Sequence, residues 1–222
     1  MQWRRQFRWQ PRRASWRVAV LFMVGSALFA LGSFPPFGQV VDPRAVGITF
    51  VVGSVFFTAA AVSQLRLTQR ESDDRRLLWA AGVQLVGTIL FNVNTVDAMI
   101  ESFDTERIDR LVWAPDMFGS AAFLIASHLA WLSACGGRWI RREESDWWIA
   151  SLNYVGSIFF MLSAIASFTL TTTGEELNTT IVNTGTFLGA VCFFVGAYLL
   201  LPASVSSPPS PRGRGPGPRP RQ

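Results

Sequence analysis

Several polar side chains that could do chemistry lie inside or at the edges of long apolar runs of this sequence, among them Gln84, Asp97, Asp116 and Asn153. If these runs cross a lipid bilayer, their polar groups are costly there and face the interior of the helical bundle. A carboxylate in such a place can bind a cation or a proton, whereas amides can join helices by hydrogen bonds. Which of these applies depends on the helices that carry them.

The usual catalytic constellations are absent from this pattern. His128 is the single histidine, and Ser120 lies on the same predicted helix at about 12 Å, too far for a nucleophile and its base. Cys135 and Cys192 lie on different apolar runs, and no cluster of ligands points to a metal. We therefore expect no catalytic residue, metal site or cofactor, and no enzymatic activity.

The elements that must position these residues are transmembrane helices. Half of the 222 residues are hydrophobic and 16% are charged, and a helix needs about 20 mostly uncharged residues to cross a bilayer. Six stretches meet that requirement: 18–37, 45–65, 77–96, 113–134, 147–170 and 179–201. The sequence predicts an all-α membrane protein with six transmembrane helices and, between residues 97 and 116, a short helix on the membrane surface.

The distribution of arginine predicts the orientation, because short basic loops stay in the cytoplasm. All 20 basic residues are Arg, which is typical of a GC-rich bacterial gene. Three of them, Arg44, Arg107 and Arg110, lie on one side, and all others lie in the arm 1–17, the loops near 70 and 140 or the tail 202–222. We therefore predict cytoplasmic termini in a bacterial inner (plasma) membrane.

The same arginines indicate partners for the two ends of the chain. We expect them to contact anionic lipid headgroups. Nucleic acid is not an expected partner, because no aromatic residue is interleaved with the arginines of the tail. Arg4 and Arg5 resemble a twin-arginine export signal, although an anchor for a retained first helix is the favoured interpretation.

One motif, G-[small]-x-x-F, occurs once in every predicted helix. Its copies run from Gly25 to Phe29, Gly53 to Phe57, Gly87 to Phe91, Gly119 to Phe123, Gly156 to Phe160 and Gly189 to Phe193. Further small or short polar residues follow seven and eight positions after each glycine. At 100° per residue, offsets 0, +4 and +7 share one stripe, so these are predicted helix-packing residues whose glycines permit close approach.

The repeat also groups the helices in pairs. We predict three tandem helical hairpins, 18–65, 77–134 and 147–201, between the basic arm 1–17 and a disordered Pro/Arg/Gly tail, 202–222. Tandem two-helix units that carry "VGS-x-x-F", as at 52–57 and 155–160, resemble the YrhK-like family of bacterial integral membrane proteins. That resemblance implies an integral membrane protein and transfers no catalytic residues.

The position three residues before each motif glycine lies close to the packing stripe. It is phenylalanine in the first hairpin, and a polar residue in the others: Gln84, Asp116, Asn153 and Thr186. With Asn94 and Asp97 these form the candidate polar site, in which Gln84 and Asn153 lie toward the cytoplasmic end and Asn94, Asp97 and Asp116 toward the outside. Two functions follow: a structural or interaction module, as a homo-oligomer or with a membrane-protein partner, or a small-solute or ion conduit with an outward vestibule near Asp97 and Asp116.

Overall fold

The computed structural model describes residues 9–100, 105–136, 145–170 and 176–201. Six long helices dominate it: α1 (Ala14–Gly32), α3 (Pro43–Glu71), α4 (Arg75–Asp97), α6 (Ala114–Cys135), α7 (Ser145–Ala166) and α8 (Thr179–Leu200). All six belong to helices long and apolar enough to cross a membrane. The predicted all-helical membrane protein with six spanning helices is thereby confirmed at this level, and the described residues contain no strand beyond one isolated bridge between Thr169 and Glu176.

Local sequence signals set several helix ends. The side chains of Asp42, Asp74 and Asn178 cap α3, α4 and α8 by accepting a hydrogen bond from a backbone N–H two or three residues later. Helix α6 ends at Gly136, whose positive φ of 50° suits a residue without a Cβ. These polar caps lie at the ends of the apolar runs, where a bilayer would give way to water.

Two segments differ from the sequence prediction. The first predicted helix, 18–37, divides after Gly32, and a short helix α2 (Pro35–Val40) follows it. Pro35 and Pro36 explain the break, since proline suits the first turn of a helix and disrupts its interior.

The second difference concerns the expected surface helix between 97 and 116. Helix α5 (Thr105–Ile108) and a π-helical turn, η1 (Asp109–Trp113), instead lead directly into α6, giving one helix of 31 residues. Pro115 accounts for the wide turn, because its ring would press on the carbonyl of Leu111 in a regular α-helix. The acidic segment thus extends a spanning helix.

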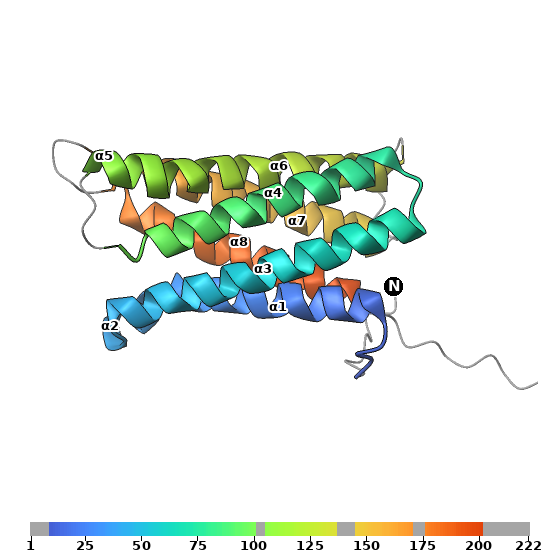
Figure 1. Ribbon diagram of the computed structural model, residues 1–222, viewed down its shortest axis with the longest axis horizontal. Coiled ribbons are helices and arrows are strands. Elements are labelled where there is room, and N and C mark those ends of the chain that lie inside the picture. The colour runs from blue at the N-terminus through green and yellow to red at the C-terminus, as the bar shows by residue number, and fades with distance from the viewer. Residues whose placement is uncertain (1–8, 101–104, 137–144, 171–175, 202–222) are drawn as a thin grey trace, which may run out of the picture.

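The long helices lie side by side and form a ring (Figure 1). Each packs on its neighbours in chain order, α1, α3, α4, α6, α7 and α8, and α8 packs back on α1. The most extensive contacts join α1 with α3, α4 with α6, and α7 with α8. The centre of the ring is therefore lined by all six motif stripes.

Phenylalanines of the motif fill this centre. We call them the phenylalanine core: Phe29, Phe57, Phe91, Phe123, Phe160 and Phe193, each at most 6% exposed. They form two triads. The rings of Phe29, Phe91 and Phe160 have centroids 6.0–6.4 Å apart. The other three lie 5.5–6.3 Å apart.

Motif glycines provide the room for these rings. A Cβ added to Gly87 would lie 2.7 Å from Phe123, and one added to Gly119 would lie 2.9 Å from Phe91. The same reciprocal contact, in which the glycine of each helix faces the phenylalanine of its neighbour, joins α1 with α3 at Gly25 and Gly53 and joins α7 with α8 at Gly156 and Gly189. The helices can approach this closely because neither carries a side chain at the contact.

Candidate functional site

Two polar cavities lie inside the ring, one at each end of the phenylalanine core. The first, here the amide cavity, has a volume of about 350 Å³ and is named for Gln64, Gln84 and Asn153. A small adjoining pocket shares these three residues and reaches Phe22 and Phe193. The second, here the acidic cavity, has a volume of about 250 Å³ and is named for Asp116 and Glu176. It reaches Phe29 of the core.

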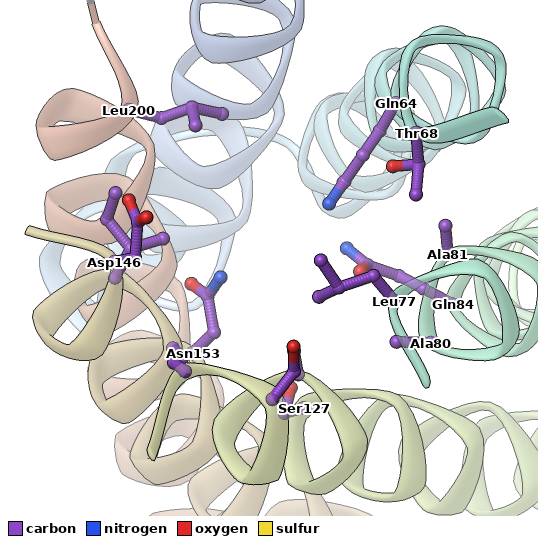
Figure 2. A pocket seen from close by; sticks show the side chains of 15 residues that line it. Gln64, Thr68, Leu77, Ala80, Ala81, Gln84, Ser127, Asp146, Asn153 and Leu200 are labelled. Atoms are coloured by element: carbon purple, nitrogen blue, oxygen red, sulfur yellow. The ribbon is translucent and has the colours of Figure 1, made fainter. Parts of the chain in front are cut away.

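The amide cavity is built by side chains from different helices. Gln64 comes from α3, Gln84 from α4 and Asn153 from α7. Figure 2 shows their amide ends turned toward the same space, with the Ser127 hydroxyl of α6 nearby. Asp146, at the start of α7, also lines the cavity, so the cavity extends to the helix ends. Any molecule in it meets amides and hydroxyls on several sides.

Most of the polar side chains that line the acidic cavity are hydrogen-bonded to other groups of the protein. The Ser167 hydroxyl donates to Asp116 at 3.4 Å, and the hydroxyls of Ser163 and Thr186 lie 2.8 Å apart. Asn94 donates through Nδ2 to the carbonyl of Val112 at 2.9 Å. These polar groups therefore join α4, α6, α7 and α8 to one another, which is the role of interhelical glue.

The side-chain amides of the amide cavity make no such hydrogen bonds to other described residues of the protein. In the described part of the chain, the side chains of Gln64, Gln84 and Asn153 make no hydrogen bond, and Oδ1 of Asn153 is buried without a partner. A Cβ on Gly196 would lie 2.6 Å from that oxygen, so this glycine makes room for the amide. Buried polar atoms are nearly always paired, so an unpaired one beside a cavity is a notable feature.

Hydroxyl pairs connect neighbouring helices at two seams of the ring. Ser54 of α3 and Thr95 of α4 lie 3.1 Å apart, and Ser127 of α6 and Ser157 of α7 lie 2.8 Å apart. In each pair one residue directly follows the motif glycine of its helix, and the other lies eight positions after the motif glycine of the neighbouring helix. At the α8–α1 seam the same two positions hold Ala197 and Ser26, which explains why Ser26 Oγ is buried without a partner.

The structure divides the candidate polar residues between the two cavities. Gln84 and Asn153 line the amide cavity, whereas Asn94, Asp116 and Thr186 line the acidic cavity. Asp97, at the end of α4, is not among the residues that line either of them. The six residues therefore do not form one site.

Sequence reasoning missed Gln64, Ser167 and Glu176, which line the cavities. A signal for the first two was present, since Gln64 and Ser167 each lie 11 positions after a motif glycine. An offset of 11 falls at about 20°, on the same stripe as offsets 0, +4 and +7. Ala130 and Leu200 share that offset and also line the amide cavity. Glu176 precedes α8 in a connecting segment that has no helical period to read.

His128 and the cysteines lie apart from both cavities. His128 is exposed, and its ring lies near those of Trp131 and Tyr154, with centroids at 6.3 Å and 5.4 Å. Neither Cys135 nor Cys192 forms a disulfide. Among the described residues, no group of three or more His, Cys, Asp or Glu side chains is placed to hold a metal ion.

Comparison with known proteins found no matching family model, no matching curated protein and no matching solved structure. The geometry of the ring, its core and its two cavities therefore has to carry the functional argument.

Proposed function

We propose that this integral membrane protein is a gated conduit for a small polar solute, with the phenylalanine core as its closed gate. The observation that carries the proposal is the arrangement of two polar cavities inside one ring of helices, with six phenylalanine rings between them. A hydrophobic constriction between two polar vestibules is a known way to close a pore, because water does not remain in a narrow apolar passage.

Both cavities are built like vestibules. Residues from α1, α3, α4, α6, α7 and α8 line the acidic cavity, and all of these helices except α1 line the amide cavity. Each cavity also touches the core, through Phe29 on one side and through the small pocket at Phe193 on the other. A solute would therefore need only the phenylalanine rings to move apart to pass between them.

Flux through proteoliposomes tests this function. We would measure urea, guanidinium and nitrate, which are planar and of similar size but differ in charge. Phe123→Ala removes a ring that is 1% exposed at the centre of the gate, and Phe123→Leu is a milder change that keeps an apolar side chain. We expect flux of at least one solute above that of protein-free liposomes, and a faster flux with Phe123→Ala.

Phe118→Ala is the matched control, because Phe118 lies on the same helix and is 65% exposed. It should leave the flux unchanged. The proposal is wrong if wild type and both Phe123 variants, reconstituted in folded form, conduct none of the three solutes above the background of the lipid.

The orientation and the hairpin repeat belong to the same proposal. We propose that the end of the bundle where α1 begins and α8 ends faces the cytoplasm, so that the amide cavity opens inward and the acidic cavity outward. Three tandem hairpins, inserted in the same sense, agree with the extensive pairing of α1 with α3, α4 with α6 and α7 with α8. In a variant that lacks the native Cys135 and Cys192, single cysteines at 72–74, between α3 and α4, should react with an impermeant reagent from the cytoplasmic side alone.

A second candidate is the non-enzymatic packing module, which the reciprocal glycine–phenylalanine contacts favour. Here the bundle would be a structural unit, alone, as a homo-oligomer or with another membrane protein, and membership of the YrhK-like family remains a prediction. Gly156→Leu should then abolish folding or assembly. Unchanged oligomeric state and thermal stability of that variant would refute the packing role of the motif.

A further inference from the structure

We infer that the amide cavity is a binding site for a small uncharged solute that carries both hydrogen-bond donors and acceptors, such as a carboxamide or a urea. The inference rests on the proposed function in treating the cavity as one end of a solute path. It goes beyond that function in assigning the ligand class and the residues that select it.

The first argument is the hydrogen-bonding capacity left over in the cavity. Each primary amide offers a carbonyl acceptor and two N–H donors, and those of Gln64, Gln84 and Asn153 are unpaired within the described chain. In the acidic cavity, in contrast, the hydroxyls of Ser163 and Thr186 are hydrogen-bonded to each other, and Asn94 donates to a backbone carbonyl. The amides of Gln64 and Gln84 are therefore available to a ligand, whereas Oδ1 of Asn153 is buried against Gly196 and leaves only the N–H groups of that amide for the cavity.

The second argument is charge. Among the residues that the structure describes, no arginine lines the amide cavity, and the one carboxylate that does, Asp146, lies exposed at the start of α7. An ion that enters such a space loses its water without gaining a counter-charge, which is costly. A neutral solute loses less hydration free energy, and hydrogen bonds to the amides replace those that it made with water. Donors and acceptors on several walls favour a ligand that presents both.

The third argument is the shape of the cavity. Its volume of about 350 Å³ lies at the low end of small-molecule pockets. Leu77, Ile149 and Leu200 provide apolar surface between the amides, so the ligand can have an apolar side as well as a polar one. In Figure 2, Leu77 and Gln84 come from α4 on one side of the cavity, and Leu200 comes from α8 on the other side.

The binding of benzamide, benzoate and benzamidinium tests the inference. These probes share one planar shape and differ in charge, and their binding to the full chain in detergent can be followed by saturation-transfer NMR and equilibrium dialysis. We expect wild type to bind benzamide at least tenfold more tightly than either ion. Gln84→Leu should weaken benzamide binding at least tenfold, because it removes one amide from the wall.

Asn153→Asp is the most discriminating variant, because it replaces the amide by a carboxylate of the same shape. The preferred probe should change from benzamide to benzamidinium. Asn183→Asp, the same substitution at a half-buried residue of α8 that lines neither cavity, is the matched control and should leave the benzamide preference unchanged. Circular dichroism establishes that each variant is folded, and Gln64→Leu replaces Gln84→Leu if the latter is not.

The outcomes separate this inference from the proposed conduit. Equal binding of the three probes, no binding of any, or a preference that folded Asn153→Asp leaves unchanged would overturn the inference, even if urea flux through proteoliposomes is measurable. Selective benzamide binding that these variants alter, together with no flux of any solute, would support the site and refute the conduit.

Discussion

A single methyl group at a motif glycine is expected to destabilise the bundle measurably, and Gly156→Ala is the sharpest case. The new Cβ would lie 2.9 Å from Phe193 Cδ2, 3.0 Å from Cys192 Cβ and 3.0 Å from the carbonyl oxygen of Gly189. Two of these neighbours are backbone or next to it, so they cannot turn away. The helices α7 and α8 would have to separate instead.

The matched control is Gly82→Ala, on α4, where an added Cβ would meet nothing within 4 Å. In both variants alanine gains about 1 kcal/mol over glycine from its helix propensity. That gain cancels in the comparison. Overpacking costs about 1–3 kcal/mol, so Gly156→Ala should be less stable than Gly82→Ala by that amount, roughly 5- to 150-fold in the unfolding equilibrium.

Unfolding in mixed micelles, followed by far-UV circular dichroism as the fraction of a denaturing detergent rises, gives both free energies. Gly82→Ala should equal or exceed wild type. If the free energies of unfolding of the two variants were the same, the close contact at Gly156 would not contribute to stability, and the packing argument for the motif would fail.

Three further predictions concern single hydrogen bonds. The hydroxyl of Ser133 holds the pKa of Asp74 below its ordinary value of 3.8. The ionised carboxylate therefore stabilises the folded protein fully above that pH, and this stabilisation is lost as the pH falls toward the folded-state pKa. Asp74→Asn should reduce the dependence of the free energy of unfolding on pH in this range. Ala197→Ser should give the buried hydroxyl of Ser26 a partner and raise the free energy of unfolding by about 0.6 kcal/mol, a gain that a further Ser26→Ala change should remove. Ser157→Ala removes a hydroxyl that joins α6 to α7 and should cost about 0.6–1.7 kcal/mol in the same unfolding assay; no loss would show that this pair is not stabilising.

The spanning helices were predictable because the bilayer imposes a simple requirement on them. Backbone groups in lipid must be paired within the helix, so an apolar run of sufficient length is nearly always a helix. The stripe of Gly25 and Phe29 follows from the 3.6-residue period in the same way. Pro35 and Pro36 predict an early end of the first helix, although the bounds 18–37 place that end five residues beyond Gly32. The π-helical turn before Pro115 was not predicted, since it depends on how one proline meets the preceding turn.

The depth of each residue along its helix already separates Gln84 and Asn153 from Asn94 and Asp116. That a cavity lies beside each group could not be predicted from any one helix. Phe22 and Phe50 occupy the positions that are polar in the other helices, and each occupies space at one corner of a cavity. Whether the space left over is filled or hollow depends on side-chain volumes contributed by all six helices. The helical period predicts that Gln84 and Asn153 lie on the faces of their helices that point into the bundle. It does not predict which side chains of the other helices lie opposite them.

The contact between α1 and α8 has a consequence for how the protein is made. Helix α1 is synthesised before α8, so the ring stays incomplete until α8 has been made. Until then the glycine–phenylalanine stripe of α1 has a partner on one side only, in α3. A chain that stops before α8 would leave this face of α1 uncovered and would lack the Phe193 ring that packs on Phe57.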